Sequence, residues 1–280
     1  MKWSIFLLVV IMVPSLVLAG TISLTTSITT DILTADQGQI QVILTNSGDE
    51  AAYNVQLSLI TDYFSSQPVH VGTLEVNKPF KTNISFNTID ELKEGNYPIV
   101  LLTEYKDANG YEFSSVSPVT LTHKNSYYSK INISFENLEI SGNKAKNLFV
   151  KLKNMDQTSH NINVRLALPN ELSSDIVNST VNLDPKMEKT IVFKISNFRG
   201  LEGSSYIVFV TTEYEDDYHY SSLARGMVRI VEGKGLNLEG KSSSILKLLP
   251  ITILIIAILV FILYQFKGKK FEIKVVRDKK

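Results

Sequence analysis

Apolar and polar residues alternate with a period of two through much of residues 21–232, the pattern of half-buried β-strands. The segment QIQVILTN places Ile40, Val42 and Leu44 between polar residues, and NLFVKLKN repeats the arrangement later in the chain. The run YIVFVTTEY is almost continuously apolar, as in a central strand buried on both sides. No segment in this region shows an apolar stripe at helical spacing. The pattern therefore predicts an all-β structure.

The same order of strands and turns occurs twice, so the region is an internal duplication. The segment VILTNSGDEAAYNVQLSL, which begins at Val42, matches VKLKNMDQTSHNINVRLAL, which begins at Val150. Further along, LKEGNYPIVLLTEYKD matches LEGSSYIVFVTTEYED. The paired positions are Asn46 with Asn154, Leu74 with Leu183, Tyr97 with Tyr206, and Thr103-Glu104-Tyr105 with Thr212-Glu213-Tyr214.

Each copy has the length and strand spacing of an immunoglobulin-like β-sandwich of about seven strands. We expect one sandwich over residues 20–123 and a second over 130–232. The short polar segment 124–129 links them, so the linker is stiff or the domains touch. The predicted fold class is two tandem immunoglobulin-like β-sandwich domains plus one C-terminal transmembrane helix.

The motifs T-N-S-G-D-E, A-x-N-V-x-L-x-L and EGNYPIVLLTEYKDANGYEFS together resemble the repeats of archaeal S-layer-associated surface proteins. They are also similar to CARDB-type adhesion-related domains. The resemblance covers both copies, although the second has NMDQT in place of the first turn and lacks the later Asn-Gly pair. It implies an immunoglobulin-like sandwich, export, and attachment to a membrane or envelope. It supplies no catalytic residues.

Both ends of the chain carry targeting patterns. Residues 1–19 read as a signal peptide, with Lys2 before an apolar run and a small-residue site ending at Ala19; an uncleaved anchor is the alternative. Residues 233–244 have the composition of a juxtamembrane stalk, and 245–266 predict a transmembrane helix. The tail, 267–280, is basic and predicted to be cytoplasmic, which gives a type I single-pass protein with its N-terminal ectodomain outside.

The charge balance argues against nucleic-acid binding. The whole chain has 28 basic and 28 acidic residues. Nine of the basic residues (Lys2, Lys247 and seven in the tail) but only two of the acidic residues lie outside the ectodomain, so the ectodomain has a net charge of about −7. The chain contains no cysteine, which excludes thiol catalysis, disulfides and a lipoprotein anchor. Core packing alone must stabilise the two domains.

The stretch TEYKDANGY predicts a hairpin, because Asn109-Gly110 favours positive φ and Asp107 can accept bonds from nearby backbone N–H groups. Its second copy, TEYEDDYHY, is more acidic and aromatic. We interpret it as an exposed tip and candidate binding site, although calcium binding stays open. The tyrosine set of Tyr127, Tyr128, Tyr218 and Tyr220 forms either a binding surface or, as is more common for such residues, packing at a domain junction or along a hairpin. The candidate residues are Glu213, Glu215, Asp216, Asp217, Tyr218 and Tyr220.

No motif for catalysis, metal binding or a cofactor is present. The four histidines, His70, His123, His160 and His219, form no H-x-x-x-H or H-E-x-x-H pair, and the chain has no phosphate-binding loop and no G-x-S-x-G. We therefore expect no enzyme activity and no cofactor, and keep a surface glycosidase or protease only as a third hypothesis. Three sequons are candidate glycosylation sites, at Asn83, Asn132 and Asn178; the first two fall in predicted strands and the third in a polar loop.

These patterns predict a non-catalytic cell-surface protein whose two domains bind an envelope protein or glycan. The alternative is an accessory subunit of a membrane complex, such as a transporter or secretion assembly, with the ectodomain as a docking module. In that case the alternating tail segment FEIKVV would add a strand to a cytoplasmic partner.

Overall fold

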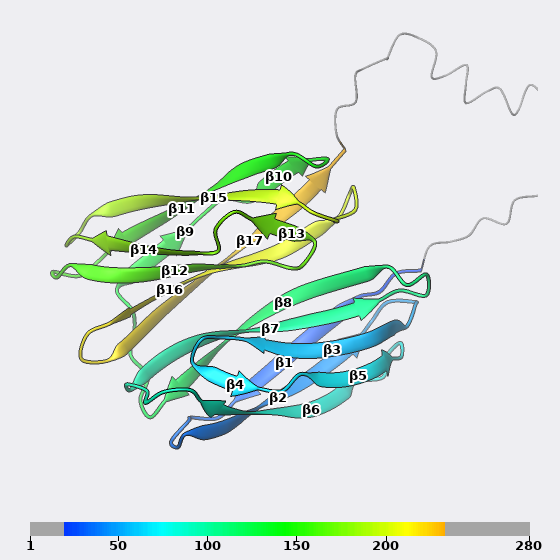
Figure 1. Cartoon of the computed structure of the whole chain (residues 1–280), viewed down its shortest axis with the longest axis horizontal. Coiled ribbons are helices and arrows are strands. Elements are labelled where there is room, and N and C mark those ends of the chain that lie inside the picture. The colour runs from blue at the N-terminus through cyan, green and yellow to red at the C-terminus, as the bar shows by residue number, and fades with distance from the viewer. Residues whose placement is uncertain (1–19, 233–280) are drawn as a thin grey trace, which may run out of the picture. The chain divides into compact units, whose positions relative to one another are not determined.

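The computed structural model describes residues 20–232, which fold from β-strands and connecting loops only (Figure 1). The all-β prediction is confirmed for this part of the chain. The signal peptide, stalk, transmembrane helix and basic tail predicted from the sequence lie outside the described residues. Within residues 20–232, no helix has the length and apolar character needed to span a bilayer.

Strands β1 to β8 form the first sandwich, with β1-β2-β6-β4 in one layer and β5-β3-β7-β8 in the other (Figure 1). Buried side chains from both layers make a separate core that includes Ile40, Leu57 and Ile99. The strand bounds are β1 Leu24–Thr30, β2 Gln37–Asn46, β3 Ala52–Ile60, β4 Phe64–Ser66, β5 Val69–Leu74, β6 Phe80–Thr88, β7 Gly95–Lys106 and β8 Glu112–His123.

Strands β9 to β17 form the second sandwich, with layers β13-β15-β11-β9 and β14-β12-β16-β17-β10. Its own core includes Val150, Val164 and Phe193. The strand bounds are β9 Ile131–Ser134, β10 Leu138–Ser141, β11 Ala145–Asn154, β12 His160–Ala167, β13 Leu172–Ser174, β14 Asn178–Leu183, β15 Glu188–Asn197, β16 Ser205–Glu215 and β17 His219–Val231.

The two copies match strand by strand, although each has more strands than the seven expected. The first has eight and the second nine. The additional strands are short: β4 and β13 have three residues each and carry no periodic signal of their own. The ninth strand, β10, corresponds in the first copy to a single bridge between Leu33 and His123.

A buried asparagine organises the same loop in both copies, at the positions paired from the sequence. Asn46 donates from Nδ2 to the carbonyl of Glu50 at 2.7 Å, and its Oδ1 accepts from the backbone N–H of Gly48 at 3.1 Å. Asn154 repeats this, with Nδ2 donating to Thr158 O at 2.7 Å and Oδ1 accepting from Asp156 N at 2.8 Å. Each Nδ2 also reaches the carbonyl of the paired leucine, at 3.5 Å for Leu74 and 3.0 Å for Leu183. The asparagine is retained because it satisfies backbone groups that the loop would otherwise bury unpaired.

A buried tyrosine near the start of the next long strand is also shared. Tyr97 donates its hydroxyl to the carbonyl of Lys93 at 2.8 Å, the bond of the tyrosine corner seen in immunoglobulin-like sandwiches. Tyr206 occupies the matching place in β16 and is 9% exposed. Both rings fill the core beneath the corner of their own sandwich.

Strand β16 is buried on both faces, as its apolar run predicted. Tyr206, Val208 and Val210 face the core of the second sandwich. Phe209 points the other way but is 6% exposed, because it packs with Val100 and Val116 of the first sandwich. The outer face of β16 is therefore covered by the neighbouring domain from Phe209 to Glu213, while Ile207 and Glu215 on the same face stay exposed.

Candidate functional site

The hairpin that joins β16 to β17 is the predicted binding tip, and the structure turns part of it toward the first sandwich. Glu215, Asp216 and Asp217 are exposed, and Tyr218 and Tyr220 are partly buried. Glu213 is only 4% exposed, so its placement on an exposed tip was wrong. It lies on the outer face of β16, which the first sandwich covers. The six predicted residues therefore do not form one open surface.

The tyrosines of the hairpin stack on one another and on the linker. The rings of Tyr127 and Tyr218 lie 3.8 Å apart at 13°, and those of Tyr214 and Tyr220 lie 4.9 Å apart at 11°. The hydrogen bond between the Tyr127 and Tyr218 hydroxyls raises the pKa of Tyr127 to about 12, with desolvation contributing. Of the two interpretations of this aromatic set, packing at the domain junction fits these contacts. Stacked rings contribute stability beyond the area they bury.

His219 is the residue of the hairpin that enters the first sandwich. Its ring stacks on Tyr97 with centroids 3.9 Å apart, and its side chain is 1% exposed. Nδ1 lies 2.8 Å from the carbonyl oxygen of Asn96, which can only accept, so Nδ1 carries a proton. The backbone N–H of His219 donates to Glu94 O at 2.9 Å, and the residue pairs with Gly95 as the bridge between β17 and β7.

The other ring nitrogen of His219 faces a buried carboxylate and a phenol. Nε2 lies 3.4 Å from Glu213 Oε2 and 3.3 Å from the Tyr63 hydroxyl. The Oε2 atom of Glu213 is buried and makes no hydrogen bond within the part of the chain that the structure describes. Burial raises the pKa of the Tyr63 phenol, and the charge of Glu213 raises it further. The His219 ring is the polar group that faces the buried Glu213 Oε2 atom, and a buried carboxylate is costly without such a neighbour.

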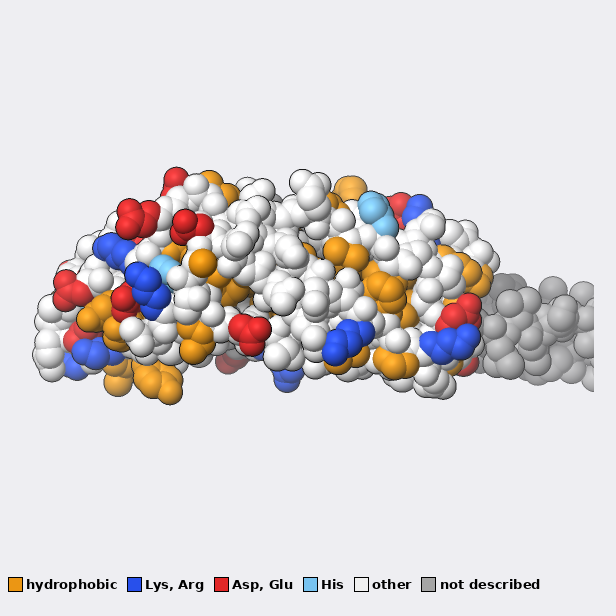
Figure 2. Space-filling model, turned by 90° about the horizontal axis from the view of Figure 1, so that it is seen from below, with side chains coloured by type: hydrophobic (Ala, Val, Ile, Leu, Met, Phe, Trp, Pro, Cys, Tyr) orange, Lys and Arg blue, Asp and Glu red, His pale blue; other side chains and the backbone are white. Residues whose placement is uncertain are grey.

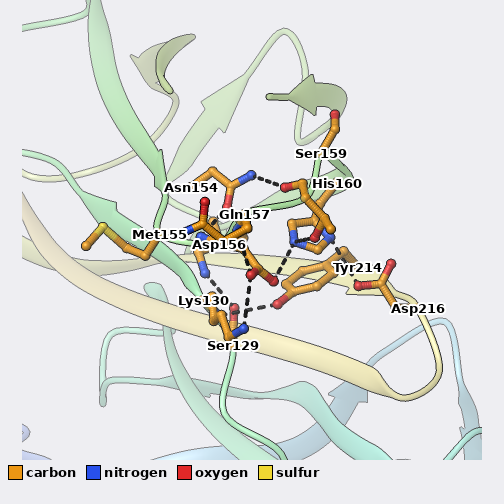
Figure 3. Close-up of polar contacts among 12 residues, drawn as sticks. Ser129, Lys130, Asn154, Met155, Asp156, Gln157, Ser159, His160, Tyr214 and Asp216 are labelled. Carbon is orange, nitrogen blue, oxygen red and sulfur yellow. Dashed lines mark hydrogen bonds and ion pairs between the residues drawn. The ribbon is translucent and has the colours of Figure 1, made fainter. Parts of the chain in front are cut away.

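A second buried histidine, His160 at the start of β12, lies beside the turn of the same hairpin (Figure 3). His160 Nε2 lies 3.2 Å from Asp156 Oδ2, and Nδ1 lies 3.1 Å from Asp216 Oδ2. The ring thus lies between two carboxylates, and of these two contacts only the one from Nε2 has the geometry of a hydrogen bond. Asp156 also accepts from Lys130 Nζ at 3.0 Å and from the backbone N–H of Gln157 at 2.7 Å. The Gln157 bond, followed by the Lys130 and His160 side-chain bonds, lowers the pKa of Asp156 to about 2.

The His160 cluster has groups that occur in catalytic sites, but it is closed. Thr158 Oγ1 lies 3.3 Å from His160 Nε2, and Asp216 lies on the other side of the ring. A hydroxyl, an imidazole and a carboxylate are therefore neighbours in space. Yet the His160 side chain is 1% exposed, which leaves a substrate no approach to the ring. Among residues 20–232, no three His, Asp or Glu side chains gather in the manner of a metal site. The cluster ties the loop after β11 to the hairpin.

Glu171 is a junction residue that the sequence analysis missed. It is 0% exposed, and its carboxylate accepts from the backbone N–H of Ser114 at 2.5 Å and from the Ser114 hydroxyl at 2.7 Å. The neighbouring Asn170 donates to Glu104 Oε1 at 2.7 Å. In the sequence Glu171 stands in the polar segment PNELSS, where an acid reads as solvated, so no local signal marks it.

Further bonds cross the junction at its ends. The Tyr111 hydroxyl donates to the carbonyl of Arg199 at 2.6 Å, and the Arg199 guanidinium pairs with Glu112 at 2.6 Å. Arg165 forms an ion pair with Asp62. With the apolar cluster of Val100, Val116 and Phe209, these contacts join the two domains along β7, β8 and β16. These buried contacts would have to break for the two domains to separate.

Two surface cavities lie away from the two buried histidines. One, of about 240 Å³, contains four charged side chains that pair partly among themselves, as in Lys106 with Glu112 at 3.0 Å. It is lined by Asn54, Gln56, Glu104, Tyr105, Lys106, Glu112, Phe113 and Arg199. The other, of about 370 Å³, lies between β4, β5 and β6 and is lined mostly by Ser, Asn and Gln side chains. Neither gathers two opposed carboxylates free of partners, the arrangement that glycosidase chemistry needs.

The three sequon asparagines are exposed. Asn83 and Asn132 lie on outward positions of β6 and β9, in the strands where they were predicted. Asn178 is the first residue of β14 and not a loop residue, and its Oδ1 accepts from Arg165 Nε at 3.2 Å. Their use as glycosylation sites stays a prediction.

No protein-family model matches the chain, and no curated protein matches it. Similar solved structures include native α2-macroglobulin of Escherichia coli, with 9% identity over 75% of this chain and 17% of that chain, at a TM-score of 0.31. The YadV chaperone is 14% identical over 72% of this chain and 98% of its own chain, at a TM-score of 0.31. The ASH/PapD-like domain of human CEP192 is 11% identical over 38% of this chain and 89% of its own chain, at a TM-score of 0.28. These likenesses concern β-sandwich architecture alone, and the chain spans less than a fifth of the α2-macroglobulin it matches. Residues 20–232 are all-β by their own strands, and immunoglobulin-like and PapD-like sandwiches are among the structural neighbours of the chain.

Proposed function

We propose that this protein is a non-catalytic, single-pass cell-surface protein whose two domains act as one rigid binding module at the cell envelope. The observation that supports this most is the use of the buried histidines and acids. His160, His219, Glu171 and Glu213 hold loops and domains together instead of lining an open cleft. What remains for function is the outer surface of a fixed pair of sandwiches, including its sheet edges and loops.

The proposal includes the finer assignments made from the sequence. Residues 245–266 would anchor the module, with the N-terminal part outside and the basic tail in the cytoplasm. The resemblance to archaeal S-layer-associated and CARDB-type proteins agrees with attachment to an envelope layer. The partner would be an envelope protein or glycan. An adhesive module benefits from a stiff ectodomain, because a preorganised surface loses less entropy on binding.

Cross-linking of the full chain in its own membrane tests the proposal. We expect an envelope protein or glycan to be recovered through the ectodomain, and recovery to persist when residues 245–266 are replaced by a generic apolar helix. Loss of all partners on that replacement would instead favour the accessory-subunit alternative, in which the span contacts other membrane subunits. Absence of any ectodomain cross-link with the native span would contradict the adhesive function.

A further inference from the structure

Strand β1 is a long, regular sheet edge without the usual protection. Leu24–Thr30 pairs with β2 through all seven residues without a bulge, and its other side has no strand partner within residues 20–232. Its sequence, LTTSITT, has no charge and no proline. Exposed edges of this kind present unpaired N–H and C=O groups to another strand, and natural proteins normally blunt them.

The other edges of the described sheets are blunted. β5 follows Pro68, is bulged against β3 and contains Gly72 at φ +80°. β8 contains Pro118, and β4, β9, β10 and β13 have four residues or fewer. These short strands leave parts of β6, β15 and β17 unpaired, but each of those stretches carries charge, from Lys81 in β6, Glu188, Lys189 and Lys194 in β15, and Arg225 in β17. β14 is the nearest competitor at six residues, but it begins at the sequon Asn178, whose side chain is held by Arg165. β1 is therefore the edge best suited to pairing.

The outer face of the sheet that contains β1 is almost free of charge. Residues 20–123 include twelve acidic and four basic residues, yet Lys81 is the only charged side chain at the outward positions of β1, β2 and β6. White surface predominates when the molecule is viewed from the side of β2 and β6 (Figure 2). Apart from Lys81 and Ile43, the outward side chains are Thr25, Ser27, Thr29, Gln37, Gln39, Gln41, Thr45, Asn83, Ser85 and Asn87.

This charge distribution selects the partner. Two acidic domains repel one another, so two copies can approach closely only where their acids are absent. An antiparallel pair of β1 strands centred on Ser27 places Ser27 opposite itself and Thr25 opposite Thr29 of the second copy. Hydroxyl pairs of this type are favourable across antiparallel strands, and the arrangement is self-complementary about a two-fold axis.

We propose that two copies of this chain associate through their β1 edges, joining two four-stranded sheets into one continuous sheet. The contact is small, but anchoring of both copies in one membrane, on which this inference rests through the proposed function, would raise their effective concentration. This association is separate from binding of an envelope partner. It would present two rigid modules side by side and strengthen that binding by avidity.

Cysteine cross-linking tests the geometry cleanly because the full chain contains no cysteine. In membranes, Ser27→Cys under mild oxidation is expected to give a disulfide-linked dimer, since directly opposed residues in antiparallel strands lie within disulfide range. Thr25→Cys alone should cross-link poorly, whereas Thr25→Cys in one tagged copy should link to Thr29→Cys in another. Matched controls are Ser85→Cys, on the same face two strands from the edge, and Thr180→Cys, on the β14 edge; neither should cross-link.

A charge substitution provides the second arm. Ser27→Lys places like charges opposite each other in the pair and should abolish the dimer, measured by mass in detergent and by cross-linking of a tagged pair. Ser85→Lys should leave the dimer intact. A wild-type chain that is monomeric in the membrane, cross-linking at Thr180→Cys instead of Ser27→Cys, or a dimer that survives Ser27→Lys would overturn the proposal.

Discussion

The imidazole of His219 lies flat against the ring of Tyr97, with the two planes 8° apart. Tyr97 belongs to the corner of the first sandwich and His219 to the β16–β17 hairpin of the second. The hairpin, predicted to be a free tip, therefore packs through His219 against the first sandwich. Several consequences for stability can be measured on a fragment of residues 20–232.

Replacing His219 by alanine should destabilise the fragment by about 2–4 kcal/mol. The change removes the stacking on Tyr97 and the bond to Asn96 O, and leaves the Glu213 carboxylate buried without its neighbour. Urea unfolding measures the difference in unfolding free energy. His70→Ala is the matched control because His70 is exposed on β5. Equal effects of the two variants would show that the contacts of His219 with the first sandwich do not stabilise the fragment.

Replacing Gly95 by alanine should loosen the contact between the domains. A Cβ on Gly95 would overlap the carbonyl oxygen of His219, and the residue has φ +150°. Gly110→Ala provides the control, because Gly110 also has positive φ but open space where its Cβ would lie. We expect Gly110→Ala to cost about 1 kcal/mol and Gly95→Ala at least about 2 kcal/mol more. Proteolysis in the 124–129 linker should accelerate only for Gly95→Ala.

Glu171 and Ser114 should be energetically coupled across the junction. Each partner leaves a buried polar group unsatisfied when the other is removed, because the Glu171 carboxylate accepts two bonds from Ser114. A double-mutant cycle with Glu171→Gln and Ser114→Ala should give a coupling of about 1–3 kcal/mol in urea unfolding. Additive effects would show that the junction does not depend on this pair. Glu91→Gln, at an exposed position, should change little.

Substitution of Asn154 by aspartate should cost about 2–4 kcal/mol. The change removes an amide that donates to the carbonyls of Thr158, Leu183 and Asp184 and points a carboxylate at them instead. Asn147→Asp on the exposed outer side of β11 is the control. Thermal unfolding of both variants, together with the matching Asn46→Asp, tests whether the two asparagines stabilise their loops to the same extent.

The Asp156 cluster predicts acid sensitivity. The pKa of Asp156 is lower in the folded state than its usual 3.8, at about 2, so the folded state prefers the ionised carboxylate. That stabilisation is complete above about pH 4 and is lost as the pH falls toward about 2. Unfolding free energies of the wild type and Asp156→Asn should therefore converge over this window. Asp90→Asn, which removes an exposed carboxyl from the first sandwich, should show no such convergence.

Local patterns were sufficient for much of the fold. Alternation at Ile40, Val42 and Leu44 specified a strand with one buried face, and all three are 0% exposed. The pairing of Asn46 with Asn154 could be read from the sequence because both side chains satisfy the same backbone groups within their own loops. The turn at Asp107 behaved likewise, with its carboxylate accepting from Asn109 N at 2.9 Å and Tyr111 N at 2.8 Å. Such interactions span a few residues, so the sequence carries them directly.

Only the tertiary structure decided what the outer faces do. Glu213 and Glu215 stand two residues apart on one face of β16, yet one is buried by the first sandwich and the other is exposed. Glu171 is buried for the same reason, through contacts with Ser114, fifty-seven positions away. An acidic residue has the same local pattern on an open surface and at a domain junction. Its environment depends on how two separately folded sandwiches pack, which is a long-range property that no periodicity in the chain encodes.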